Sequence, residues 1–295
     1  MTLILSLAAP PFVVQAADRL LTNLVDRRPV NTNAGKTVLF KNRMVFSFTG
    51  IAEILGQPTD QWLRNVLRSL PDMSLSDVLE HVRARATADV ARLRYDREYR
   101  HLTFVGVGYS YNGTDFIPMI CRLSNARGKR GQRLRVPEDK FTLACRRYGI
   151  PGSPRYTWLD SGYPMLESEI RRLSRNIRRC ARRDCNAWSV ARLFVEQIRS
   201  VADRSQVVGR DVLVSIIPRS AADQETGVIM HPGRRVGGVF GVDVSKPIPT
   251  GTEMHFAFVP DGVSFWSHCR SDQYGPIVVW DGGSMSNISW KPRKK

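Results

Sequence analysis

The sequence predicts an α+β fold in which two pairs of helices cover a stacked pair of β-sheets. The order of the predicted elements carries this expectation, because strands, two helices, strands, two helices and one more strand precede a β-rich tail. The chain has 295 residues, of which 42% are hydrophobic, so it can bury one large core. We therefore expect a four-layer αββα sandwich over residues 1–219 and a β-rich C-terminal extension over residues 220–295.

The first fifty residues predict four strands that are separated by turns. Pro10-Pro11 interrupts two apolar runs, and Asn42 separates two more. Residues rich in β-branched and aromatic side chains return after the second helix and again before the C-terminal extension. We expect strands at residues 3–7, 12–17, 37–40, 44–48, 102–110, 116–124, 139–146 and 212–217. In the extension we expect short β runs at residues 227–230, 236–244, 255–259, 263–266 and 277–280.

Four helices are predicted by apolar residues that recur at helical spacing. The first begins at Pro58-Thr59-Asp60, and Ser74 is a capping residue for the second. We expect these helices at residues 58–70, 75–93, 166–183 and 187–202. The third helix has an apolar stripe and seven arginines on its remaining faces: Arg171, Arg172, Arg175, Arg178, Arg179, Arg182 and Arg183.

The chain is strongly basic, with 44 Lys and Arg against 27 Asp and Glu and a net charge of +17. Such a charge favours acidic partners, among them nucleic acid, but it is also compatible with arginines spread over a solvated surface. The helix at 166–183 is a possible face for an acidic partner. The basic loop at 125–135 lacks interleaved aromatic residues, which argues against binding of single-stranded nucleic acid there.

The cysteine and histidine pattern predicts neither a disulfide framework nor a metal site. Five cysteines are an odd number, which favours a reducing cytosol, and neither the cysteines nor the histidines have zinc-ligand spacing. We expect no metal and no cofactor. No apolar run reaches 18 residues, so we expect no membrane span and a cytoplasmic protein. A signal peptide cleaved after Ala17 is an alternative, although no basic residue precedes its apolar run and Pro10-Pro11 interrupts it.

Residue 2 is a candidate nucleophile. Removal of Met1 would make Thr2 the N-terminal residue, with a hydroxyl as nucleophile and its own α-amine, of pKa about 8, as base. A nearby Lys36 cation would lower the pKa of that amine, and Asp18 would hold Lys36 in place. The backbone N–H of Gly50 is a candidate oxyanion donor, and the Ser161 hydroxyl could hydrogen-bond the amine.

These residues, in this order, resemble the proteasome-type branch of the N-terminal-nucleophile hydrolases. The resemblance covers about residues 2–217. In that family an acidic residue and an arginine end the second strand, a lysine opens the third and a glycine ends the fourth, as Asp18-Arg19, Lys36 and Gly50 do here. Ser161 of Asp160-Ser161-Gly162 matches a family Gly-Ser-Gly. A family Asp-x-x-Ser-Gly-Gly is degraded here to residues 203–209, which keep Asp203 and Gly209 and put Ser205 near the motif serine.

The resemblance implies a threonine-type peptidase or amidase that acts on a peptide or amide substrate. It implies catalytic roles for Thr2, Asp18, Lys36, Ser161 and Asp203, and supporting roles for Arg19 and Ser205. It also implies a homo-oligomer that assembles through its helices. Two alternatives remain open from the sequence. One is an inactive member of the fold that acts as an assembly or binding module, and the other is a basic nucleic-acid-associated protein.

Overall fold

The computed structural model describes residues 2–23, 26–32, 34–40, 43–70, 73–128, 132–148, 156–181 and 187–219, together with five short strands between residues 229 and 290. Within these residues the fold is a mixed α/β arrangement of antiparallel sheets and four α-helices. No described helix is both long and apolar enough to cross a membrane.

The first sheet has the strand order β12-β1-β2-β13 and is antiparallel throughout. Its two central strands meet beside the N-terminus, where β1 begins at Leu3 and β2 ends at Asp18. At this edge Leu3 pairs with Gly162 and Asp18 pairs with Val212. The predicted strands at 3–7, 12–17 and 212–217 are confirmed. The strands span Leu3–Ala9 (β1), Phe12–Asp18 (β2), Thr157–Gly162 (β12) and Val212–Pro218 (β13).

The second sheet has the strand order β11-β10-β9-β6-β5 and is also antiparallel. All five of its strands were expected from the sequence, within a few residues at each end. They span Thr37–Phe40 (β5), Met44–Gly50 (β6), Leu102–Tyr111 (β9), Phe116–Ser124 (β10) and Thr142–Arg147 (β11).

The four predicted helices are confirmed with small changes at their ends. They span Thr59–Arg68 (α1), Leu75–Ala91 (α2), Glu167–Ala181 (α3) and Ala187–Ala202 (α4). The Ser74 hydroxyl caps α2 as expected, since it accepts a hydrogen bond from the Asp77 backbone N–H at 3.3 Å. Arg182 and Arg183, which we expected in the third helix, lie outside the described residues.

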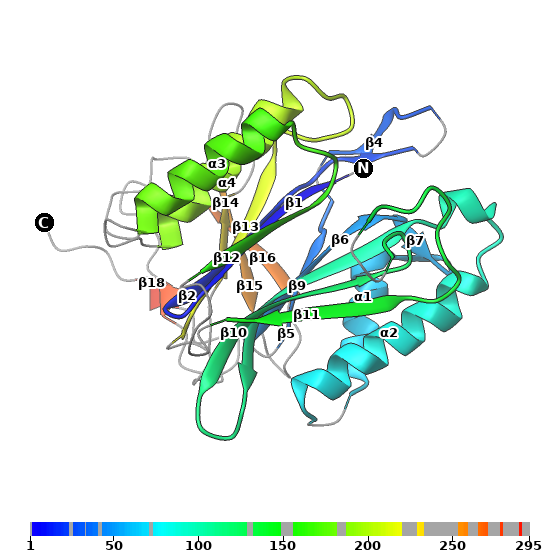
Figure 1. The fold of residues 1–295 in the computed structure, drawn as a ribbon, viewed down its shortest axis with the longest axis horizontal. Coiled ribbons are helices and arrows are strands. Elements are labelled where there is room, and N and C mark those ends of the chain that lie inside the picture. The colour runs from blue at the N-terminus through cyan, green and yellow to red at the C-terminus, as the bar shows by residue number, and fades with distance from the viewer. Residues whose placement is uncertain are drawn as a thin grey trace, which may run out of the picture.

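Each sheet is covered by helices on one face, and the two sheets share a core on the other (Figure 1). Strand residues alternate between these faces, so odd and even positions of one strand enter different cores. In β1, Leu3 and Leu5 pack toward α3 and α4, while Ile4 packs between the sheets against Val105 and Val107. Full burial of each such side chain contributes about 1.5–3 kcal/mol to folding.

Several short elements escape prediction from the sequence. A β-hairpin joins Leu21–Thr22 (β3) to Pro29–Asn31 (β4), and a second pairs Glu53–Ile54 (β7) with Gln57–Pro58 (β8). A 3-10 turn spans Arg97–Tyr99. Two- and three-residue strands that include proline or asparagine carry too little apolar alternation to be recognised.

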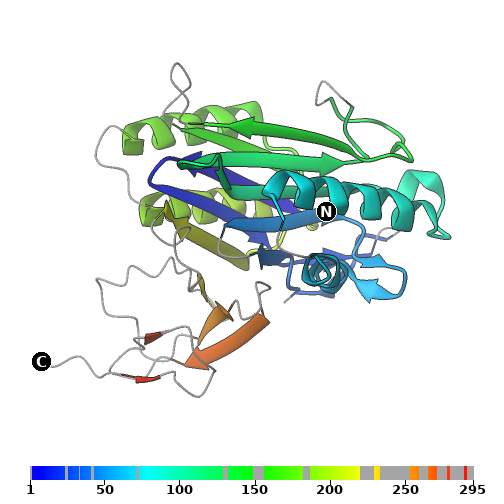
Figure 2. The ribbon, with the colours of Figure 1, turned by 90° about the horizontal axis from the view of Figure 1, so that it is seen from below.

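The C-terminal region contributes further β structure outside the two main sheets. Ile229–Pro232 (β14), Glu253–Phe258 (β15) and Phe265–Arg270 (β16) form a three-stranded antiparallel sheet, and Val278–Val279 (β17) pairs with Ser289–Trp290 (β18). Figure 2 shows β15 and β16 in orange beside the main body. The predicted run at 236–244 lies outside the described residues.

Candidate active site

Thr2 lies at the start of β1, the strand that pairs with both β2 and β12. Its side chain belongs to the face between the sheets, because Ile4, two residues later, belongs to the inter-sheet core. Thr2 is only 4% exposed. The Tyr163 backbone N–H donates to the Thr2 carbonyl at 2.8 Å, which fixes the end of the strand.

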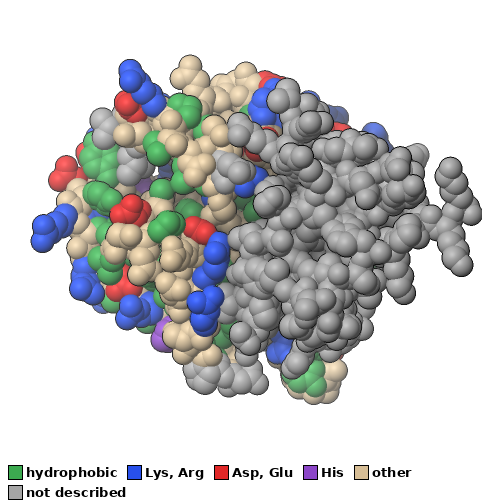
Figure 3. All heavy atoms as spheres, turned by 180° about the vertical axis from the view of Figure 1, so that it is seen from behind, with side chains coloured by type: hydrophobic (Ala, Val, Ile, Leu, Met, Phe, Trp, Pro, Cys, Tyr) green, Lys and Arg blue, Asp and Glu red, His purple; other side chains and the backbone are tan. Residues whose placement is uncertain are grey.

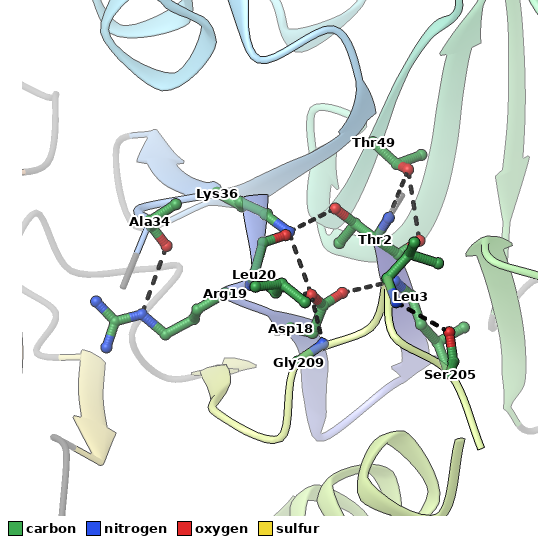
Figure 4. A network of polar contacts seen from close by, with 11 residues as sticks. Thr2, Leu3, Asp18, Arg19, Leu20, Ala34, Lys36, Thr49, Ser205 and Gly209 are labelled. Carbon is green, nitrogen blue, oxygen red and sulfur yellow. Dashed lines mark hydrogen bonds and ion pairs between the residues drawn. The ribbon is translucent and has the colours of Figure 1, made fainter. Parts of the chain in front are cut away.

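Lys36 lies directly before β5, and its ammonium group is surrounded by three acceptors (Figure 4). Lys36 Nζ donates to Thr2 Oγ1 at 2.7 Å, to Asp18 Oδ2 at 3.2 Å and to the Leu20 carbonyl at 2.5 Å. The side chain is 1% exposed. A lysine ammonium has three donors and no acceptor, so this environment matches its charged form and directs one donor at the Thr2 hydroxyl.

Asp18 ends β2 and anchors Lys36 from a fully buried position. Its Oδ1 accepts from the Leu3 backbone N–H at 2.7 Å. Its Oδ2 accepts from the backbone N–H groups of Leu20 and Gly209, both at 3.1 Å, and from Lys36. The carboxylate thus accepts four hydrogen bonds, one at Oδ1 and three at Oδ2. The carboxylate therefore has little freedom to move away from Lys36.

The pKa of Lys36 is shifted by burial and by two charged neighbours, Asp18 and Arg19. Burial lowers its pKa from the ordinary value of 10.5, because the ammonium loses its hydration, and the Asp18 carboxylate opposes this shift. The nearby Arg19 cation adds a smaller effect that also lowers the pKa. The net direction is downward, so Lys36 can lose its proton at a lower pH than an exposed lysine.

Arg19 holds the segment that leads to Lys36. Its Nε donates to the Ala34 carbonyl at 3.4 Å, and its own carbonyl accepts from the Ala34 backbone N–H at 3.0 Å. Its backbone N–H bonds to the Asp211 carbonyl at 3.0 Å. Arg19 thus connects the end of β2 with the segment that leads to Lys36.

Two hydroxyl groups lie on the same inter-sheet face as Thr2. Thr49 Oγ1 accepts from the Thr2 backbone nitrogen at 3.2 Å. Ser161 pairs with Ile4 in the β1–β12 register and is 2% exposed, and its hydroxyl has no hydrogen-bond partner among the described residues. A buried hydroxyl without a partner costs about 1–3 kcal/mol, so a partner such as a free amine or a water would be favoured there.

Two glycines at strand ends have backbone conformations that exclude side chains. Gly162 has φ +95°, and a Cβ there would lie 1.7 Å from the Thr2 carbonyl oxygen. Gly50 has φ +112°, and a Cβ there would lie 1.9 Å from the His101 carbonyl oxygen. Gly162 therefore permits the close approach of β12 to Thr2, and Gly50 ends β6 one residue after Thr49.

Within the degraded motif at 203–209, the direct contact with a site residue among the described interactions comes from its last residue. Gly209 donates to Asp18, as described above. The Asp203 side chain forms an ion pair with Arg210 and is 55% exposed, and it makes no contact with Thr2 or Lys36 among the described interactions. The Ser205 hydroxyl accepts from the Val207 backbone N–H at 3.2 Å.

The structure thus brings together Thr2, Asp18 and Lys36, with Arg19 in contact behind them, and it does not bring Asp203 to this group. Sequence reasoning did not identify Thr49 or the backbone donors of Tyr163 and Gly209. For Thr49 the available signal was a polar residue at the end of an apolar strand. Among the described residues no three or more His, Cys, Asp or Glu side chains are grouped so that they could hold a metal ion.

Comparison with known proteins gives structural likenesses only. No protein-family model matches the sequence, and no curated protein matches it either. The chain is similar to an Anbu (Gly-1) mutant from Hyphomicrobium sp. strain MC1, with 16% identity, a TM-score of 0.48 and coverage of 76% of this chain and 84% of that one. It is also similar to Anbu, described as an ancestral beta-subunit, from Yersinia bercovieri, with 12% identity, a TM-score of 0.45 and coverage of 75% and 83%. Both identities and both TM-scores are low, so these likenesses say nothing about the activity of this chain.

Proposed function

We propose that this protein is an N-terminal-threonine amide hydrolase, with Thr2 as nucleophile after removal of Met1. The observation that supports this most directly is the 2.7 Å contact from the buried Lys36 ammonium to the Thr2 hydroxyl. A cation placed there stabilises the alkoxide that forms when the hydroxyl loses its proton. Lysines on protein surfaces are solvated, so burial of this one beside a hydroxyl and a carboxylate favours a chemical role.

The proposed reaction is an acyl transfer in two stages. Thr2 Oγ attacks the carbonyl carbon of a peptide or amide, and its proton passes to the free Thr2 amine. The tetrahedral intermediate collapses, the C–N bond breaks, and the protonated amine donates its proton to the leaving nitrogen. Water then attacks the acyl ester with the same amine as base, which releases the acid and restores the Thr2 hydroxyl.

Each supporting residue has one role in this scheme. Lys36 stabilises developing charge on Thr2 Oγ, and Asp18 keeps Lys36 in position. The Gly50 backbone N–H is the proposed oxyanion donor. The Ser161 hydroxyl, buried and without a partner among the described residues, is the proposed hydrogen-bond partner of the free amine. Asp203 is left out of this scheme because its carboxylate pairs with Arg210.

The same proposal includes the architecture and the assembly. We propose a four-layer αββα sandwich of the N-terminal-nucleophile type over residues 1–219 and a β-rich extension over residues 220–295. Two helix pairs and two sheets with a shared core support it. We propose a cytoplasmic homo-oligomer. An inactive member of this fold that serves as an assembly module is the alternative, and retention of Met1 would favour it.

We also infer that α3 offers a face to an acidic partner. Arg175, Arg178 and Arg179 are exposed and make no ion pair with any described residue. A hollow of about 720 Å³ runs beside this helix, and the described residues that line it include Arg171, Arg175 and Arg178 and none of the site residues. The affinity of nucleic acid for this face would fall steeply with added salt, because each neutralised phosphate releases counterions.

Hydrolysis of a panel of fluorogenic peptide amides by three forms of the protein tests the proposed function. We expect the wild type to hydrolyse at least one substrate, Thr2→Ala to lose the activity, and Thr2→Ser to keep part of it, since serine retains the hydroxyl and the amine. Thr2→Ala removes one acceptor of the buried Lys36 ammonium, so its melting temperature is measured to show that the variant remains folded. Equal rates in the wild type and Thr2→Ala would show that the chemistry lies elsewhere.

A further inference from the structure

The alternation of β6 brings the Thr49 hydroxyl to the atom that the proposed mechanism uses as base. Val45, Ser47 and Thr49 share one face of the strand, and Val45 belongs to the core between the sheets. On that face the Ser47 hydroxyl donates to Gln15 Oε1 of β2 at 2.7 Å, so the two sheets are already joined by buried polar contacts. Thr49 makes the corresponding contact with Thr2, one strand further along.

Thr49 contacts two atoms of the Thr2 backbone. Its Oγ1 accepts from the Thr2 nitrogen at 3.2 Å and donates to the Thr2 carbonyl oxygen at 3.4 Å. Thr49 is 8% exposed, so water has little access to compete for these contacts. The absence of a side chain at Gly162 makes room for the hydroxyl, because a Cβ there would lie 3.1 Å from Thr49 Oγ1.

The hydrogen-bond capacity of a hydroxyl determines what Thr49 can do for a free amine. A threonine hydroxyl has one donor and two acceptor positions. Its donor is used by the Thr2 carbonyl, so toward the Thr2 nitrogen it acts only as an acceptor. An unprotonated amine has two N–H donors and one lone pair. When one N–H points at Thr49, the lone pair is restricted to other directions, and one of these is toward the Thr2 hydroxyl.

We propose that Thr49 is a further catalytic residue, which accepts an N–H from the free Thr2 amine and orients its lone pair toward the Thr2 hydroxyl. This inference rests on the proposed function, because it requires Met1 to be removed. A hydroxyl that accepts from the amine also stabilises the ammonium form. Loss of the hydroxyl should therefore slow proton transfer and lower the pKa of the amine.

The alternative is that Thr49 only fills space and satisfies buried backbone groups. Valine has nearly the shape of threonine, so Thr49→Val removes the hydroxyl and keeps the packing. Thr49→Ser keeps the hydroxyl and removes a methyl group. Thr103→Val is the matched control, because Thr103 pairs with Thr49 across β6 and β9 and is 5% exposed. Its hydroxyl bonds to Ser124 at 2.6 Å and, among the described interactions, makes no contact with Thr2.

The pH dependence of hydrolysis separates these two roles. We expect Thr49→Val to reduce kcat by about 10- to 100-fold with little change in KM, as misdirection of a general base would. Its acidic limb in kcat/KM should move to lower pH, and Thr49→Ser should recover most of the rate and the wild-type limb. Thr103→Val should leave the rate and the limb unchanged.

Two outcomes identify which claim fails. If Thr2→Ala is inactive while Thr49→Val has the wild-type kcat and an unmoved acidic limb, the role of Thr49 is overturned and the proposed function stands. If Thr2→Ala keeps full activity, the proposed function itself fails.

If no substrate is hydrolysed, titration of the α-amine nitrogen in ¹⁵N-threonine-labelled protein is the readout. We expect a lower pKa in Thr49→Val than in the wild type, and equal values would overturn the inference.

Discussion

At the scale of single residues, the site depends on one buried ion pair that also contacts a hydroxyl. Lys36 and Asp18 are 1% and 0% exposed; the Lys36 ammonium donates three hydrogen bonds and the Asp18 carboxylate accepts four. Removing one member of such a pair leaves the other charge buried and unpaired, which is costly. We therefore expect changes here to affect stability as well as rate, so that stability must be measured alongside every rate.

The pH–rate profile tests the coupling of Lys36 to Asp18. If the ammonium form is active, kcat/KM falls as pH rises through the pKa of Lys36, which burial places below 10.5. Asp18 raises that pKa, so Asp18→Asn should lower it and move the alkaline limb to lower pH. Lys36→Met should remove this limb and reduce the rate by about 10²–10³-fold. An Asp18→Asn enzyme with an unmoved alkaline limb would show that the two groups are not coupled.

At the scale of elements, the end of β12 is shaped by the backbone of Thr2. Gly162 and Gly113 both have positive φ, at +95° and +99°. A Cβ at Gly162 would overlap the Thr2 carbonyl, whereas a Cβ at Gly113 would meet nothing within 4 Å. An alanine at Gly113 would therefore add backbone strain alone, which costs about 1–3 kcal/mol, whereas an alanine at Gly162 would add both strain and steric overlap.

We expect Gly162→Ala to lose clearly more thermal stability than Gly113→Ala and to lose most of its hydrolytic activity. Gly113→Ala should lose only the strain contribution and keep its activity, since that residue lies in the turn between β9 and β10. Thermal melts and rates of the two variants provide the comparison. Equal losses would contradict the close approach of β12 to Thr2.

Arg204 connects the two segments that supply backbone donors to the site. It donates to both Glu169 oxygens, at 3.0 and 2.7 Å, and its guanidinium lies 5.5 Å from the centre of the Tyr163 ring. The Tyr163 N–H bonds to Thr2, and the segment that follows Arg204 ends at Gly209, which donates to Asp18. Arg204 itself lies within residues 203–209, the segment that departs from the family motif.

Replacing Arg204 should displace both the Tyr163 and the Gly209 backbone N–H groups, which donate to Thr2 and Asp18. We expect Arg204→Ala to cost about 1.5–3 kcal/mol of stability, as a hydrogen-bonded charged pair does, and to reduce kcat. Arg171→Ala is the matched control, because the Arg171–Glu167 pair is 72% and 76% exposed and such pairs contribute about 0–1 kcal/mol. Chemical denaturation and initial rates measure both effects. Equal behaviour of the two variants would remove Arg204 from the support of the site.

At the scale of the whole molecule, the long elements other than β12 could be predicted from the sequence, and the contacts between them could not. The strands of residues 2–50 and the four helices follow from local periodicity. The meeting of Thr2, Asp18 and Lys36 was expected from the resemblance of their motifs to the family, since Lys36 precedes β5 of the other sheet. Thr49 could not, because its contact depends on how the two sheets stack, and the pairing of Asp203 with Arg210 depends on the path of a loop.

The charge distribution bears on assembly. On the face shown in Figure 3, basic and acidic side chains are interspersed over the described residues. The exposed arginines of α3 would repel a copy of themselves, so we expect a homo-oligomer joined through α1 and α2 or through the C-terminal strands. Light scattering at physiological salt should give a mass above that of one 33.4 kDa chain. A strict monomer would contradict the assembly.

The central claim is that Thr2 is a free N-terminal residue with a reactive hydroxyl beside Lys36. A peptide α′,β′-epoxyketone can react with both the hydroxyl and the amine of such a residue, so the mass of the N-terminal proteolytic fragment after treatment tests the claim most directly. We expect a fragment that begins at Thr2 and carries one inhibitor, and no adduct on Thr2→Ala. A fragment that retains Met1, or an unmodified Thr2 in a protein that still hydrolyses peptides, would contradict the account.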